Sequence, residues 1–166
     1  MGLQITLYRE TAIDDCDRAS GIVDLSREVW KNGTRIDTPY KINVSKIRSI
    51  VEEVAIWYKD SWLSRWIEDE IVHDNIIEYQ DYYVDIEDIK NLQLSIFKIL
   101  SRPEGRARDE EAKKLLPYDT SFGISETYDE AYYKTLKESD KILRDIITAA
   151  KKNDDGSTYY YFKIIF

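Results

Sequence analysis

Alternating apolar and polar residues predict a β-strand at each end of the sequence. In residues 2–9, Leu3, Ile5 and Leu7 are separated by polar residues, and this period of two is typical of a half-buried strand. Residues 158–166, with the sequence TYYYFKIIF, predict the second strong strand. We expect these two strands to pair side by side, with helices packed against one face of their sheet.

The centre of the sequence predicts a long helix. Apolar residues at spacings of three and four over residues 45–71 fit one helix of about 25 residues, with Ser45 as its N-cap. Trp57, Trp62 and Trp66 all lie on this predicted helix. Because aromatic rings are the largest apolar side chains, we expect the helix to dominate the core.

A strand and a second helix are expected after this segment. Residues 78–84 are tyrosine-rich and predict a short strand or a turn. Asp85 is the expected N-cap of a helix that ends before Pro103. The apolar face of this helix runs from Ile86 through Phe97 to Leu100 at helical spacing.

The other segments give weaker or alternative signals. Residues 20–30 fit either a short strand with a turn or an amphipathic helix, and we expect residues 30–43 to be mostly irregular. Residues 106–116 predict a short charged helix or a loop. Thr127 and Glu130 predict a capping box for a last helix.

These elements together predict a single α+β domain that spans residues 1–166. Its sheet is small and mainly antiparallel, includes both terminal strands, and packs against three or more helices. A chain of 166 residues is long enough for one domain with a hydrophobic core and short for two.

Charge and cysteine content narrow the classes of function. With 32 acidic and 24 basic residues, the formal net charge is -8, which disfavours direct nucleic-acid binding because phosphate recognition needs clustered Lys and Arg. No apolar run approaches the ~20 residues that span a bilayer, so no membrane association is expected. Cys16 is the only cysteine, which indicates a reducing compartment and a cytoplasmic protein.

Few residues are suited to catalysis or metal binding. His73 is the only histidine, and its spacing from Glu70 forms half of a carboxylate-bridged metal site that needs a second copy. Asp129 and Glu130 could act as paired carboxylates, but capping and the helix dipole explain acids in a first helical turn. We predict a non-enzymatic protein with no catalytic residue, no metal ligand and no cofactor.

Three stretches resemble a family of small phage and prophage accessory proteins, over roughly two-thirds of the chain. The opening MGLQITLYR is similar to the Met-Gly-Leu-Asp-Met-Tyr-Leu strand of that family. The central EVAIWYKDSWLSRWIED resembles its Tyr-Trp-Arg-Lys-x-Asn-x-Ile-His-x-Trp helix. The later LLPYDTSFGISETYDEAYYKTL resembles its Leu-Leu-Pro, Phe-x-x-Gly and Tyr-Asp-Glu-x-Tyr-Tyr segments. The family has no established activity, so the resemblance implies a phage origin and no particular chemistry.

This chain also differs from the family pattern at three positions that matter for a shared ligand site. Where the family has Arg, Asn and His, this chain has Tyr58, Ser61 and Ser64. Those three polar groups would form the centre of any small-ligand site of the family, so their absence puts a transferred site in doubt. The positions that do match are Trp57, Lys59, Trp66, Phe122, Gly123, Tyr128, Asp129, Glu130, Tyr132 and Tyr133.

The leading hypothesis is a phage-encoded accessory protein that acts in the host cytoplasm. It would bind and inhibit a bacterial host protein, such as a CRISPR nuclease or another defence component, and its acidic surface could occupy a basic nucleic-acid channel. The first alternative is a nucleotide-binding sponge, with a pocket between the tryptophan helix and residues 118–133 and with Lys59 or Arg65 at its mouth. The second alternative is a hydrolase that uses Asp129 and Glu130. The sequence is also compatible with a protein that forms a homodimer.

The candidate binding residues combine the matched positions with nearby aromatic and basic residues. With 13 tyrosines in the chain, such rings either fill the edges of a thin core or form an interface, and the sequence favours neither. The candidates are Trp57, Lys59, Arg65, Trp66, Tyr82, Tyr83, Tyr118, Phe122, Tyr128, Asp129, Glu130 and Tyr133.

Overall fold

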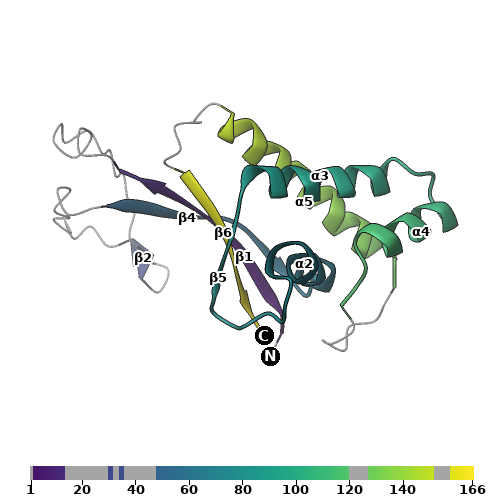
Figure 1. The fold of residues 1–166 in the computed structure, drawn as a ribbon, viewed down its shortest axis with the longest axis horizontal. Coiled ribbons are helices and arrows are strands. Elements are labelled where there is room, and N and C mark those ends of the chain that lie inside the picture. Colours follow the sequence, from purple (N-terminus) through teal and green to yellow (C-terminus); the bar gives the residue numbers. More distant parts are fainter. Residues whose placement is uncertain (1, 14–29, 32–33, 36–47, 120–126, 152–157) are drawn as a thin grey trace. The chain divides into compact units, whose positions relative to one another are not determined.

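The computed structural model describes residues 2–13, 30–31, 34–35, 48–119, 127–151 and 158–166 (Figure 1). They belong to two units, one made of Met1–Glu10 with Val51–Phe166 and the other of Thr11–Ile50. Single-domain organisation stays a prediction. Cys16, Ser45 and the ambiguous segment 20–30, except for its last residue, lie outside the described residues.

The larger sheet has four antiparallel strands in the order β4-β1-β6-β5. The two terminal strands, β1 and β6, are neighbours at its centre. The N- and C-terminal ends of the chain lie close together in Figure 1. This confirms the predicted pairing of the terminal strands. The strands are β1 (Gln4–Ala12), β4 (Ser49–Tyr58), β5 (Asp81–Val84) and β6 (Thr158–Ile165).

A second, two-stranded pairing lies where an irregular connection was expected. Strands β2 (Trp30–Lys31) and β3 (Thr34–Arg35) pair antiparallel and flank the dipeptide Asn32-Gly33. Asn-Gly is a strong sequence signal for a two-residue hairpin loop, so the pairing has a local cause.

The predicted central helix is wrong for its first half. Residues 49–58 form β4, and a helix begins only at Ser61 as α2 (Ser61–Ile67), which continues into a π-helical turn, η2 (Glu68–Val72). Apolar residues four positions apart fit a strand as well as a helix. Four is a multiple of the two-residue period of a strand and is also close to the ~3.6 residues of one helical turn. Lys59 then adopts a φ of 63°, in the left-handed region, and this separates strand from helix.

The second helix begins as the sequence predicts. It is α3 (Ile86–Leu100), whose N-cap Asp85 accepts a hydrogen bond from the backbone N–H of Asp88 at 2.9 Å. Ile89 lies on its buried face as expected, but Phe97, predicted on that face, is 49% exposed. The buried face of α3 is therefore narrower than the sequence pattern suggests.

Two further helices follow, α4 (Arg106–Leu115) and α5 (Glu130–Ala150). The predicted capping box of Thr127 and Glu130 is wrong, because Asp129 is the N-cap of α5. Its carboxylate accepts a hydrogen bond from the backbone N–H of Tyr132 at 3.1 Å. A carboxylate at this place also interacts favourably with the positive end of the helix dipole.

The core lies between the sheet and the helices. Phe162 of β6 packs against Trp57 and Trp66, with ring centroids 6.2 and 6.4 Å away. α3 packs against both α5 and α4. The fold is thus α+β, as predicted, with four α-helices among the described residues. None of the described helices is long and apolar enough to span a membrane.

Candidate binding site

Three of the predicted binding residues belong to the core instead of a contact surface. Trp57, Trp66 and Tyr82 are all buried. The indole Nε1–H of Trp57 donates to the hydroxyl of Ser139 at 2.8 Å, and the hydroxyl of Tyr82 donates to the carbonyl of Ile77 at 3.1 Å. The polar atoms of Trp57 and Tyr82 are therefore satisfied inside the protein.

The two predicted basic residues lie on the surface near α2. Lys59 is exposed in the connection from β4 to α2. Arg65 is half-exposed on α2, and its Nε donates to the carboxylate of Asp69 at 2.8 Å. An exposed pair at this helical spacing is worth little stability and commits Arg65 to a local contact.

Four tyrosines form a cluster where the end of α4 meets the first turn of α5. The ring centroids of Tyr118 and Tyr128 are 5.3 Å apart, those of Tyr128 and Tyr132 are 5.0 Å apart, and those of Tyr132 and Tyr133 are 5.1 Å apart. The hydroxyl of Tyr132 donates to the carbonyl of Leu116 at 3.0 Å. The structure thus brings together Tyr118, Tyr128 and Tyr133 of the predicted set.

Burial favours the protonated form of three phenols in this cluster. It raises the pKa values of Tyr118, Tyr132 and Tyr133 well above that of a free tyrosine. For Tyr133, a hydrogen bond to the carboxylate of Asp109 raises the pKa further. These hydroxyls act as hydrogen-bond donors and are poorly suited to act as general bases.

A pocket of about 580 Å³ opens beside the tyrosine cluster. It lies between the start of α4 and the first turns of α5, not beside the tryptophans. Its lining includes four predicted residues, Tyr128, Asp129, Glu130 and Tyr133. The sequence prediction missed the others, which are Glu104, Gly105, Arg108, Asp109, Lys134 and Lys137.

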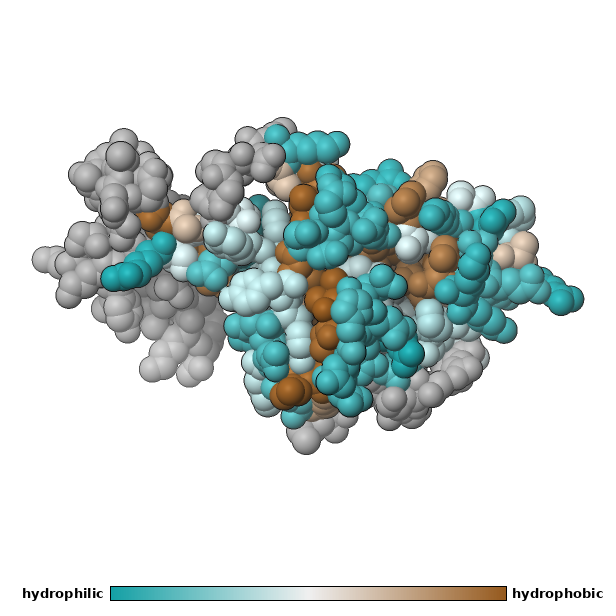
Figure 2. Space-filling view, viewed as in Figure 1, coloured by the Kyte–Doolittle hydropathy of each residue, from teal (hydrophilic) through white to brown (hydrophobic). Residues whose placement is uncertain are grey.

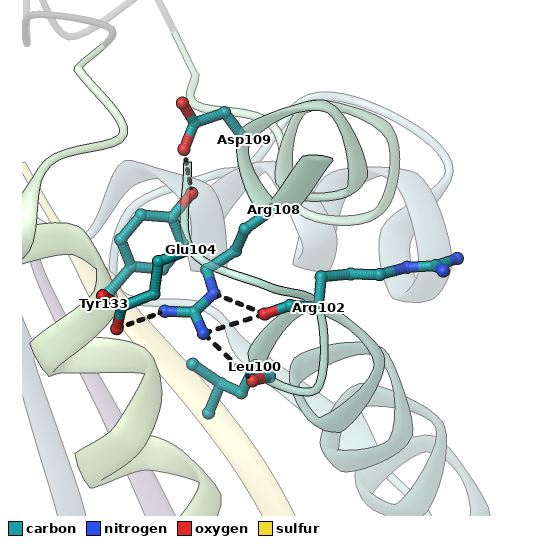
Figure 3. Close-up of polar contacts among 6 residues, drawn as sticks. All are labelled: Leu100, Arg102, Glu104, Arg108, Asp109 and Tyr133. Atoms are coloured by element: carbon teal, nitrogen blue, oxygen red, sulfur yellow. Dashed lines mark hydrogen bonds and ion pairs between the residues drawn. The ribbon is translucent and has the colours of Figure 1, made fainter. Parts of the chain in front are cut away.

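Arg108 is the best-buried cation of the pocket, and Figure 3 shows that its guanidinium points toward the end of α3. It donates to the carbonyl of Arg102 at 2.8 and 3.1 Å and to that of Leu100 at 3.4 Å, and it pairs with Glu104 at 3.1 Å. The side chain of Arg108 is 12% exposed. The guanidinium therefore caps the C-terminus of α3, where free carbonyls favour a positive charge.

The two aspartates of the pocket are also engaged. Asp109 accepts a hydrogen bond of 2.5 Å from the hydroxyl of Tyr133 (Figure 3). Asp129 caps α5 and accepts a further hydrogen bond from the hydroxyl of Thr127 at 3.3 Å. Glu130 beside it is exposed. Arg108 and Glu104 are thus paired with each other, and both aspartates are committed to hydrogen bonds within the protein. This arrangement is better suited to structure and binding than to proton transfer.

The tyrosines of β5 and β6 alternate between the core and the outer face of the sheet. Tyr82 and Tyr160 belong to the core, whereas Tyr83 is 61% and Tyr159 is 53% exposed. Tyr161 pairs with Tyr83 in the strand register, and their ring centroids are 5.5 Å apart. The period of two in TYYYFKIIF is the signal that could have separated Tyr160 from Tyr159 and Tyr161.

Tyr8 of β1 extends this row across a third strand. Its ring stacks on that of Tyr161, with a centroid distance of 5.3 Å and an interplanar angle of 21°. We call Tyr8, Tyr83, Tyr159 and Tyr161 the tyrosine face. Figure 2 shows pale, weakly polar surface near β5, next to a mixture of hydrophilic and hydrophobic surface over the helices.

Other sequence-predicted positions contribute less. Phe122 and Gly123 lie outside the described residues. His73 is exposed, and its Nδ1 lies 2.8 Å from the carbonyl oxygen of Asp69. No group of three or more His, Cys, Asp or Glu side chains within the described part of the chain is placed to hold a metal ion.

Comparison with models of protein families, with curated proteins and with solved structures finds no match to the chain.

Proposed function

We propose that the chain is a non-enzymatic, phage-encoded accessory protein that binds and inhibits a bacterial host protein, a defence component such as a CRISPR nuclease. The tyrosine face carries this proposal, because it places two exposed rings, Tyr83 and Tyr159, on the same side of the sheet as the packed rings of Tyr8 and Tyr161. Tyrosine is enriched at protein interfaces, where its ring supplies contact area and its hydroxyl a hydrogen bond. The phage origin is supported by the sequence resemblance.

The distribution of charge favours the tyrosine face over the acidic surface as the means of binding. On the helices, carboxylates alternate with bases and pair with them, as in Arg106–Glu110 at 2.7 Å and Arg144–Asp140 at 2.9 Å. A protein that imitates nucleic acid would instead need clustered, unpaired carboxylates on one face. The net charge of -8 then assists the encounter with a basic partner without defining the contact.

A small-molecule sponge is the second candidate, and the pocket beside the tyrosine cluster favours it. Its volume of about 580 Å³ falls in the range of roughly 300–1,000 Å³ typical of ligand sites. The rings of Tyr128 and Tyr133 would contact a base, and Lys134 and Lys137 would contact its phosphates. This arrangement replaces the earlier expectation of a site with Lys59 or Arg65 at its mouth.

Capture from bacterial lysate separates the two candidates. The tagged protein is purified from lysate, and the eluate is divided between protein mass spectrometry and small-molecule analysis. We expect a stoichiometric protein partner that is lost from the variant Tyr83→Ser/Tyr159→Ser and retained by Lys134→Ala/Lys137→Ala. A nucleotide that co-purifies without any protein, and that only the lysine variant loses, would contradict the proposal and support the sponge.

A further inference from the structure

We propose that the tyrosine face binds an arginine-rich segment of its partner protein. This inference rests on the proposed function and adds the chemistry of the partner. Tyrosine rings attract cations through the negative charge of their faces, and arginine both stacks on such rings and sheds its hydration more easily than lysine.

The geometry of the sheet holds the rings in place. Tyr161 lies between Tyr8 and Tyr83, at centroid distances of 5.3 and 5.5 Å, and is itself buried by these neighbours. Tyr159 lies two residues before Tyr161 on β6, so it points to the same side of the sheet. Because Tyr161 contacts both Tyr8 and Tyr83, these three rings are held in place before any partner binds.

The fold already contains a cation on this face. The ammonium of Lys163 lies 5.8 Å from the ring centroid of Tyr8 and 5.9 Å from that of Tyr161. Asp81 holds Lys163 in this position through an ion pair of 2.9 Å across the β5–β6 register. Among the described residues, no such cation lies over Tyr83 or Tyr159, so the two most exposed rings of the face are open to a cation from a partner.

Charge complementarity selects an arginine-rich protein segment over other occupants. A single-stranded nucleic acid could stack bases on the rings, but its phosphates would approach a chain with a net charge of -8. Lys163, the cation beside these rings, is already paired with Asp81. A second copy of the chain would bring the same negative charge. An arginine-rich segment instead gains from both the rings and the net charge.

The test measures binding of two peptides of equal charge. Fluorescently labelled nona-arginine and nona-lysine are titrated with the full-length protein at physiological ionic strength, and binding is followed by fluorescence anisotropy. We expect nona-arginine to bind about tenfold more tightly, because the planar guanidinium group stacks on tyrosine and is more weakly hydrated than the ammonium group of lysine. The variant Tyr83→Leu/Tyr159→Leu should lose this preference and bind the two peptides alike.

Two control variants test whether the arginine preference depends on the aromatic rings of the tyrosine face. Tyr83→Phe retains the ring and should retain the arginine preference. Phe97→Leu removes an exposed aromatic ring from α3 and should also leave the preference unchanged. Circular dichroism and thermal unfolding of each variant, compared with wild type, show whether the fold is retained.

Three results would overturn the inference. The first is equal affinity of the wild-type protein for the two peptides. The second is tighter binding of a single-stranded oligonucleotide that the leucine variant loses. The third is self-association that the leucine variant abolishes. Each of these results rejects the arginine-rich partner segment alone. A protein partner that is captured from lysate and lost from Tyr83→Ser/Tyr159→Ser would still support the proposed function.

Discussion

At the scale of single residues, buried serines occur in two distinct environments. The hydroxyl of Ser139 on α5 accepts the indole N–H of Trp57 and donates to the carbonyl of Thr135 at 2.7 Å. Ser61 and Ser64 on α2 are equally buried, but their hydroxyl oxygens have no hydrogen-bond partner. A buried hydroxyl stabilises a fold only where its hydrogen bonds are made, so these serines should differ sharply in their effect on stability.

We predict that Ser139→Ala lowers the free energy of unfolding by about 1–3 kcal/mol, because it leaves the buried N–H of Trp57 unsatisfied. Ser64→Ala is the matched control, since it removes a buried hydroxyl that makes no hydrogen bond and places a better helix former in α2. It should leave stability unchanged or raise it. Urea denaturation followed by tryptophan fluorescence measures both, and equal losses in the two variants would contradict the account.

Asp60 provides a prediction about pH. Its burial raises its pKa above the ordinary value of 3.8, although Trp62 donates a hydrogen bond to its carboxylate at 3.2 Å. Between 3.8 and the raised pKa, the folded state binds more protons than the unfolded state, so this group makes stability fall as pH rises through that window.

Asp60→Asn removes this titration and keeps an acceptor for the indole N–H of Trp62. The stability of the variant relative to wild type should therefore increase as pH rises from 4 to 7, because only the wild type loses stability through this group. Urea denaturation at a series of pH values measures the difference. A relative stability that is constant with pH would mean that the carboxylate is not destabilised in the fold.

At the scale of elements, the junction of α3, α4 and α5 depends on one arginine. Arg108 reaches back from α4 to the carbonyls of Leu100, the last residue of α3, and of Arg102 just beyond it. The ring centroid of Tyr133 on α5 lies 5.4 Å from the guanidinium carbon of Arg108. Arg106, two residues earlier on α4, is 92% exposed, and its one ion pair with a described residue is with Glu110. The two arginines carry the same guanidinium group, but we expect only Arg108 to contribute much to the stability of the fold.

We expect Arg108→Met to lower the free energy of unfolding by about 1–3 kcal/mol, since it leaves carbonyls at the C-terminus of α3 without their charged donor. Arg106→Met should have little effect, because exposed ion pairs contribute little. Chemical denaturation of both variants measures the contrast. Similar effects of the two substitutions would show that the junction does not depend on the position of Arg108.

How far sequence predicts these elements depends on whether their periodicity is unique. The terminal strands, α3 and α5 have patterns that fit one period only, and their existence was predicted. The segment around Val54 fits the period of a helix and that of a strand. Its pairing with β1 in the sheet favours the strand, β4. The pocket could not be predicted, because Arg108 and Tyr133 are brought together only by helix packing. Tyr83 was identified as a binding candidate, but its separation from Tyr82 needed the strand register.

At the scale of the whole molecule, the proposed function gives the charges and the aromatic rings different roles. Ion pairs are frequent on the helices, and the net charge of -8 would act at long range on the rate of encounter with a partner. The tyrosine face would supply short-range contacts, whose loss would appear mainly in the dissociation rate. Binding should therefore weaken with added salt and still depend on Tyr83 and Tyr159 when salt is high.

The most direct test of the central claim is an activity assay of the captured host protein in the presence of this chain. The wild-type protein is expected to abolish that activity at stoichiometric concentration, and Tyr83→Ser/Tyr159→Ser should fail to do so although it remains folded. Undiminished activity of the host protein at saturating wild-type concentration, or equal inhibition by the variant, would contradict an inhibitor that acts through the tyrosine face.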